Sequence, residues 1–386
     1  MIPYEYNKHT YGKHFMNDVI WNDESWTACE SLQRNITCDV CVVGLGGSGL
    51  AAIELFAAHG VNVIGIDAGM VGGAAAGSNG GFILAGIAAF HHEAVASLGA
   101  TIATTLYQET IDEIALLAQH EPLFRQVGSL RIATDATEYA DCVAQYVRMR
   151  QDGLTVEWYE GSEGHGLLFP HDGAFQPLKR VRRIAHHVRS AGVQLYERTR
   201  ATNIERGFIC ANGHTISCKQ VIVAVDGQLE CILPILAQQV STTRLQMLAT
   251  APDHTIMLPR PVYARYGYDY WQQLPNGRIV VGGCRDKYAA SEWGFDTLPT
   301  PDVQMSIETI LRTVIGSEAT ITHRWGASVS YRSDDIRPLI AQVQPGIWVC
   351  GAYNGTGNIV GSICAKHIAR AIITGSTTHM QAWVST

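Results

Sequence analysis

Three glycines near the start of this 386-residue chain stand at a spacing that suits phosphate binding. Gly44, Gly46 and Gly49 follow the apolar run 40–43 and precede small residues for which we predict a helix. In such a strand–turn–helix unit, the glycines permit a tight turn, close approach of a pyrophosphate, and close packing of helix on strand. Asp67 ends the next apolar run about 20 residues later, where a carboxylate accepts hydrogen bonds from ribose hydroxyls. The pattern predicts a dinucleotide-binding βαβ unit.

A second glycine-rich turn stands near the other end of the chain. The apolar run 347–350 leads into 351–357, and a helix is predicted from Asn358 to Thr374. The N-terminus of a helix carries partial positive charge and free N–H groups. It therefore suits a second electron-rich part of the same ligand, which in a flavin is the N1–C2=O edge.

Composition limits the function classes. With 47% hydrophobic and 16% charged residues, the chain is typical of a globular enzyme of about two domains. A net charge of -7 without a basic run argues against a nucleic-acid partner. The first residues lack the basic and apolar regions of a cleaved signal peptide, so we expect a cytoplasmic protein. Residues 71–90 carry no charge, but their glycines with Ser78 and Asn79 predict a loop and no membrane span.

Two short motifs suggest other chemistry. Cys38 and Cys41 form a Cys-x-x-Cys pair on the predicted first strand rather than at a helix start, which favours buried thiols. His91, His92 and Glu93 are adjacent, and no further ligands stand at metal spacing, so no metal site is predicted.

Nucleotide-type segments recur far apart, which predicts two interleaved domains. The predicted class is α/β, or α+β overall, with a Rossmann-like domain interleaved with an antiparallel-sheet substrate domain. The expected ranges are 36–95, 176–233 and 320–386 for the nucleotide domain, 96–175 and 234–319 for the substrate domain, and 1–35 for an N-terminal extension.

An aromatic stretch in the second predicted domain is the expected floor of a substrate pocket. Residues 262–273 and 278–283 alternate in polarity around an Asn276-Gly277 turn, which predicts an antiparallel hairpin. The alternative is an inert, well-packed aromatic sheet. Only alternate side chains can face a pocket, and the candidates are Tyr266, Tyr268, Tyr270 and Trp271. No acid–base residue stands out, so no catalytic residue is assigned.

Four stretches together resemble the D-amino acid oxidase superfamily of FAD-dependent amine and amino-acid oxidoreductases: 36–44, 77–81, 268–283 and 324–357. The resemblance spans nearly the whole chain. It implies oxidation of the C–N bond of a small amine or amino acid by hydride transfer to flavin N5, giving an imine that hydrolyses. Oxygen or another carrier would accept the electrons. Ala327 stands where sarcosine oxidases carry the cysteine that holds flavin covalently, so the FAD is expected to be non-covalent.

The resemblance also implies roles for individual residues. Ala201 would meet the adenine through its backbone, Asp67 would bind the ribose, and the pyrophosphate would lie on Gly44, Gly46, Gly47, Ser48 and Gly49. The other implied FAD contacts are Ala68, Gly77, Ser78, Asn79, Gly80, Gly81, Ala224, Gly227, Arg337, Gly351, Asn354, Gly355, Thr356, Gly357 and Asn358.

The chain departs from the family pattern at two points. Where relatives have Gly-Arg-Asn-Gly-Gly, the arginine is replaced by Ser78, which predicts weaker cofactor binding. Where relatives have Ser-Gly-His-Gly, this chain has Asn354-Gly355-Thr356-Gly357, which keeps the glycines and loses the histidine.

Arg337 lies in a segment, 335–338, that resembles the Asp-Gly-x-Pro turn beside the flavin. The residue is therefore a candidate flavin or substrate-carboxylate contact, and the alternative is a salt bridge.

Three other functions stay open. A flavin hydroxylase shares the opening motif, although its late Gly-Asp pair is absent at 350–353. An NAD-dependent dehydrogenase is disfavoured by ligand-type turns at both ends of the chain. A non-catalytic FAD-binding subunit is compatible with the sequence at 354–357.

Overall fold

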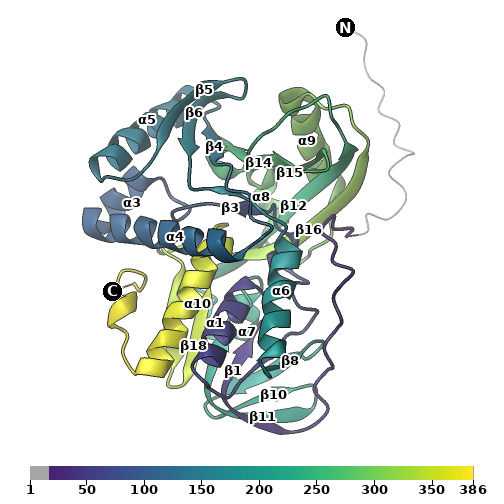
Figure 1. The fold of residues 1–386 in the computed structure, drawn as a ribbon, viewed down its shortest axis with the longest axis vertical. Coiled ribbons are helices and arrows are strands. Elements are labelled where there is room, and N and C mark those ends of the chain that lie inside the picture. Colours follow the sequence, from purple (N-terminus) through teal and green to yellow (C-terminus); the bar gives the residue numbers. More distant parts are fainter. Residues whose placement is uncertain (1–16, 386) are drawn as a thin grey trace.

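The computed structural model describes residues 17–385 and contains two large sheets, one in each half of the molecule (Figure 1). In the first sheet, β18, β11, β1, β2 and β8 are neighbours in that order and run parallel. Ligands of such sheets bind at the carboxyl ends of the strands. The strands of the first sheet are β1 (Ile36–Val43), β2 (Val63–Ile66), β8 (Gln194–Tyr196), β9 (Ala201–Glu205), β10 (Phe208–Ala211), β11 (His214–Val223), β17 (Leu339–Gln344) and β18 (Ile347–Gly351).

Helices and a hairpin cover the two faces of the first sheet. Phe56, Val188 and Ile368 pack into one apolar cluster with one face of the central strands. They belong to α1 (Gly47–Ala58), α6 (Pro177–Ser190) and α10 (Gly357–Thr374). On the other face, Ile209 and Leu229 pack from the β9–β10 hairpin and α7 (Leu229–Ile232). The apolar runs 40–43, 63–66, 221–223 and 347–351 of the parallel strands are therefore fully buried between these two layers.

The second sheet is mostly antiparallel, in the order β16-β12-β15-β14-β13-β4-β6-β5. Its strands are β4 (Ser129–Ile132), β5 (Glu157–Gly161), β6 (Gly164–Phe169), β12 (Val240–Pro252), β13 (Val262–Ala264), β14 (Asp269–Gln273), β15 (Arg278–Gly283) and β16 (Ile321–Arg332). It is accompanied by α5 (Ala136–Gln151), α8 (Ala289–Glu292) and α9 (Pro301–Ile310).

Contacts between α4 (Ala100–His120) and α10 join the two halves. Glu113 on α4 pairs with Lys366 on α10 at 2.6 Å, and Glu109 contacts His367 at 2.9 Å. The remaining short elements are α2 (Ala75–Ser78), β3 (Phe82–Ile83), which pairs with β7 (Gly173–Ala174), and α3 (His91–Leu98). No helix within residues 17–385 is long and apolar enough to cross a membrane.

The predicted fold class is confirmed, and the β14–β15 hairpin forms around its Asn-Gly turn. The prediction of one strand over 262–273 is wrong, because Arg265 and Tyr266 adopt positive φ and separate β13 from β14. Arg265 is held there by ion pairs to Asp269 and Asp286 at 2.6 and 2.8 Å.

The division into two domains stays a prediction, and one element differs from it. We expected residues 320–386 in the nucleotide domain, but β16 pairs with β12 in the second sheet from Val240↔Arg332 to Thr250↔Ile321. The N-terminal extension was predicted as 1–35, and residues 1–16 lie outside the described part of the chain.

Candidate active site

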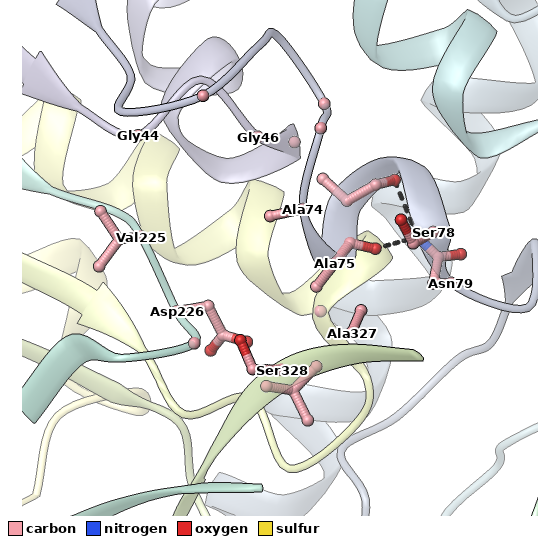
Figure 2. A pocket seen from close by; sticks show the side chains of 18 of the residues that line it. Gly44, Gly46, Ala74, Ala75, Ser78, Asn79, Val225, Asp226, Ala327 and Ser328 are labelled. Atoms are coloured by element: carbon pink, nitrogen blue, oxygen red, sulfur yellow. Dashed lines mark hydrogen bonds between the residues drawn. The ribbon is translucent and has the colours of Figure 1, made fainter. Parts of the chain in front are cut away.

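A cavity of about 510 Å³ lies at the carboxyl edge of the first sheet. In Figure 2, the turn with Gly44 and Gly46, the segment with Ala75 and Ser78, and the strand with Ala327 border it from different sides. Of the residues predicted to bind a cofactor, the following line this cavity: Gly44, Gly46, Gly47, Ser48, Asp67, Ala68, Ser78, Asn79, Ala201, Ala224, Gly227, Gly355, Gly357 and Asn358.

The turn between β1 and α1 presents backbone to the cavity. Gly44 has φ +106°, and a Cβ there would come within 2.6 Å of the Ala224 carbonyl oxygen. A Cβ on Gly49 would overlap the carbonyl oxygen of Gly44, so this glycine packs the helix against the turn. The N–H groups of the first helical turn have no partner within an α-helix, and Gly47 and Ser48 line the cavity. This end of the cavity suits an anion.

Asp67 stands at the end of β2 and organises the neighbouring backbone. Its carboxylate accepts hydrogen bonds from the N–H groups of Leu45 and Gly69, both at 2.7 Å. Burial raises the pKa of the Asp67 carboxyl, whereas these two N–H groups oppose the rise. The remaining lone pairs can accept hydrogen bonds from ribose hydroxyls, beside Arg200 and Ala201 in the same cavity.

The N-terminus of α10 lies at the same cavity as the N-terminus of α1. The Tyr353 hydroxyl donates to Ser48 Oγ at 2.9 Å, which ties the two turns together. Gly361 on α10 leaves room for Ser48, because a Cβ at residue 361 would overlap the serine hydroxyl. Two helix N-termini therefore face one ligand space, as the two glycine-rich turns predicted.

Arg180 is a cavity residue that the sequence analysis missed. It is 7% exposed, lines the cavity from α6, and reaches within 4.0 Å of the Cβ position of Gly47. Within residues 17–385, its guanidinium has no carboxylate within 4.0 Å, and burial lowers its pKa. Four of the five residues 179–183 are basic, but this run does not reveal which side chain faces inward.

Ser78, which replaces the family's arginine, keeps a structural role through its backbone. Its carbonyl oxygen accepts a hydrogen bond from Trp325 Nε1 at 2.7 Å. Arg180 places a positive charge in the same cavity.

Asp226 is a second missed residue. It follows β11 with φ +54° and accepts a hydrogen bond from the Ala352 N–H at 2.8 Å. Burial raises its pKa to about 6, although backbone N–H groups, among them that of Ser330, oppose the rise. The cavity therefore contains a carboxyl group that changes charge near neutral pH.

A second cavity of about 330 Å³ adjoins the first and is lined by the second sheet with its connecting segments, by residues of the segment 75–88 and by the turn 354–358. The two cavities have these lining residues in common: Ala75, Ser78, Asn79, Leu245, Ala327, Val329, Gly355 and Asn358. Its larger polar side chains are Arg131, Tyr263, Tyr266, Tyr268, Tyr270, Arg285 and Tyr331. Gly80, Asn354 and Thr356, which were predicted as cofactor contacts, line this cavity and not the first.

The structure places three of the four aromatic candidates at the second cavity and one in the apolar core. Tyr266, Tyr268 and Tyr270 line the second cavity. Trp271 does not: it is 5% exposed and packs in an apolar cluster with Val303 and Ile307 of α9. Successive side chains of β14 point to opposite faces, so the placement of Tyr270 excludes Trp271 from the cavity.

Arg337 lies outside both cavities. It pairs with Asp335 at 2.7 Å and donates to the carbonyl oxygen of Val384 at 2.6 Å. The geometry therefore matches the salt-bridge alternative, and the role of Arg337 as a flavin or substrate-carboxylate contact stays a prediction.

Four predicted glycines also lie outside the cavity linings, namely Gly49, Gly77, Gly81 and Gly351. A Cβ at Gly77 would overlap the Gly72 carbonyl oxygen, and one at Gly81 would come within 2.6 Å of the Phe175 oxygen. These glycines act by allowing close backbone packing.

The sequence matches the family model "FAD dependent oxidoreductase" over residues 39–371. The chain belongs to this family. The FAD-dependent oxidoreductases include the D-amino acid oxidase type that the motif arrangement resembles, and the match favours FAD over the nicotinamide alternative.

Two curated relatives and a solved structure agree with this assignment. The chain is 26% identical to probable oxidoreductase OrdL of Rhizobium meliloti, over 88% of this chain and 84% of that protein. It is 24% identical to gamma-glutamylputrescine oxidoreductase of Escherichia coli, over 66% of each chain. Glycine oxidase from Bacillus cereus has the same fold, with a TM-score of 0.74 and 16% identity over 90% of this chain and 98% of that one.

The residues present fit FAD. The first cavity offers a glycine cradle, a carboxylate at the end of β2, two helix N-termini and Arg180. Among the described residues, no cysteine or histidine lines either cavity, and Ala327 lines both, which agrees with non-covalent binding. No group of three metal-ligating side chains occurs between residues 17 and 385.

Proposed function

We propose that this protein oxidises the carbon–nitrogen bond of a small amine or amino acid, giving an imine that water hydrolyses. The observation that carries the proposal is the shared boundary of the two cavities, because it brings a substrate space next to the cofactor space. When bound, FAD supplies the acceptor for a hydride from the carbon that bears the nitrogen. Oxygen or another carrier as the final acceptor, and a cytoplasmic location, remain part of the proposal.

The cofactor would be held mainly by the first cavity's backbone. The α1 N-terminus and Arg180 would bind the diphosphate, and Asp67 would bind the ribose. The α10 N-terminus would stabilise the negative charge of the reduced ring.

The second cavity would prepare the substrate nitrogen. A hydride leaves readily only when the nitrogen is neutral, because its lone pair must assist. Among residues 17–385, no Asp, Glu, Lys or His lines this cavity, whereas Arg131 and Arg285 do. Two nearby cations and an aromatic, partly desolvated wall lower the pKa of a bound ammonium group. The chain would thus favour the reactive amine without a dedicated base, releasing the proton to water.

A single anaerobic turnover tests the proposal. The FAD-loaded protein is mixed with amines and amino acids, and reduced flavin and carbonyl product are both quantified. We expect one equivalent of carbonyl compound per flavin reduced, and slower reduction when the carbon that bears nitrogen is deuterated. Flavin that no amine reduces would contradict the proposal and favour the non-catalytic FAD-binding subunit.

A further inference from the structure

Two arginines at the second cavity are held in the same way, each by two aromatic rings. The Arg131 guanidinium lies 3.9 Å from the ring centre of Phe90 and 5.1 Å from that of Tyr263. The Arg285 guanidinium lies 4.2 Å from the ring centre of Tyr331 and 4.8 Å from that of Tyr268. Stacking fixes a guanidinium plane while leaving its N–H edge available for a ligand.

Neither arginine is neutralised by a carboxylate within 4.0 Å in the described part of the chain. By contrast, Arg265, in the segment between β13 and β14, is paired with two aspartates. Arg131 is 8% exposed, donates from Nη1 to Gln145 Oε1 at 2.9 Å, and has no partner for its Nε. A buried guanidinium with an unused donor is costly unless a ligand completes it.

Two acids near residues that line the cavity are already engaged by other donors. Asp172 accepts from Ser129 Oγ at 2.6 Å and from the Ala85 N–H at 2.8 Å, and burial raises its pKa to about 7. Glu138 accepts from the Tyr266 N–H and from Thr134. Because no acidic side chain of the described residues lines the cavity, Arg131 and Arg285 give its lining an excess of positive charge.

We propose that the substrate is an amino acid with two carboxylates, one bound by Arg131 and the other by Arg285. Guanidinium groups bind carboxylates through paired, charge-assisted hydrogen bonds. The same charges disfavour di- and polyamines, which carry only positive groups and find no acid among the described residues that line the cavity. This inference rests on the proposed function and narrows it to a substrate class.

Binding of two amine-free acids, compared with binding of a diamine, tests the recognition separately from oxidation. Glutarate, butanoate and putrescine are titrated into the FAD-loaded protein, and binding is followed by calorimetry and by the change in the flavin spectrum. We expect glutarate to bind at least about tenfold more tightly than butanoate, and putrescine to bind most weakly. Equal affinity for the two acids, or tighter binding of putrescine, would overturn the proposal.

Variants assign the two carboxylates to residues. Arg131→Gln and Arg285→Gln should each weaken glutarate binding about tenfold, and each should reduce the preference over butanoate. Arg150→Gln is the matched control, because Arg150 is exposed on α5 and loses the same charge. The FAD content of each variant shows whether that variant has folded. If the buried Arg131 variant fails to fold, the wild-type preference and Arg285→Gln still decide the outcome.

Flavin reduction then separates this inference from the proposed function. Glutamate, aspartate and iminodiacetate are compared with glycine, alanine and putrescine under anaerobic conditions. Faster reduction by the dicarboxylates supports both ideas. Equal or faster reduction by glycine, alanine or putrescine would contradict the dicarboxylate inference and leave amine oxidation standing. Selective glutarate binding with no reduction by any amine would contradict the proposed function while leaving dicarboxylate recognition standing.

Discussion

The two adjoining cavities are built in different ways. The first is bordered largely by backbone: strand ends, glycine turns and the N-termini of α1 and α10. The second is bordered by many large side chains, among them tyrosines and arginines from separate strands and connecting segments of the other sheet. A backbone site recognises features common to every FAD molecule, whereas a side-chain site can change its ligand through single substitutions.

The largest effect should come from filling the backbone cradle. Gly46→Val places a branched side chain beside Ala76, since a Cβ at residue 46 already lies 3.2 Å from the Ala76 Cβ. Gly46 has φ -87°, so the valine itself is not strained. We expect loss of bound FAD, measured by visible absorbance, with a native far-ultraviolet circular dichroism spectrum. Ala58→Val, at the exposed end of the same helix, should keep its FAD.

The two faces of β14 offer the next test. Trp271→Ala should lower the free energy of unfolding by about 3–5 kcal/mol, because the indole packs in the core against α9. Tyr270→Phe should leave the unfolding midpoint close to wild type, because the Tyr270 hydroxyl has no hydrogen-bond partner among the described residues. Chemical denaturation measures both. A stable Trp271→Ala protein with altered substrate kinetics would contradict the placement of the two side chains.

Arg180 is the main side-chain contribution to the otherwise backbone-built cavity. Arg180→Ala should weaken FAD binding by about 1.5–3 kcal/mol, or about ten- to a hundredfold, by removing a charge-assisted contact. Lys179→Ala, exposed on the same helix, should have little effect. Fluorescence titration of the apoprotein with FAD measures both affinities. Equal FAD affinities of the Arg180→Ala and Lys179→Ala variants would show that Arg180 does not replace the arginine lost at Ser78.

The smallest expected effect concerns pH. The pKa of Asp226 is raised to about 6 by burial, so its carboxyl is neutral below that pH and negative above it. The negative form repels the FAD diphosphate, and affinity should therefore fall a few-fold as pH rises through about 6. Asp226→Asn should flatten this step between about pH 5 and 8. Asp67 is unchanged in the variant, so the difference between the two titrations isolates Asp226. An identical pH profile would exclude this role.

The difference between the backbone-built first cavity and the side-chain-built second cavity also explains which parts of the site the sequence can predict. Gly44, Gly46, Asp67 and the two glycine-rich turns are recognisable because a backbone site depends on local spacing along one strand–turn–helix unit. The β14–β15 hairpin follows for the same reason, since its Asn-Gly turn is local.

The missed residues depend on tertiary contacts. Arg180 is one of several basic residues on α6, and only packing selects it for the interior. Arg131 and Arg285 come from β4 and from the segment after β15, so no sequence spacing joins them. Trp271 packs against α9, which is distant in the chain, so the sequence alone did not show which face of β14 is buried. Arg337 is held by the neighbouring Asp335 and by the distant carbonyl group of Val384, and only the second contact depends on tertiary structure.

The decisive measurement is the visible spectrum of the purified, FAD-reconstituted protein during anaerobic titration with amines and amino acids. We predict flavin absorption bands that bleach on addition of a substrate, with the dicarboxylic amino acids acting at the lowest concentrations. A protein that binds no FAD, or whose bound flavin stays oxidised with every amine and amino acid, would contradict the proposed amine oxidation.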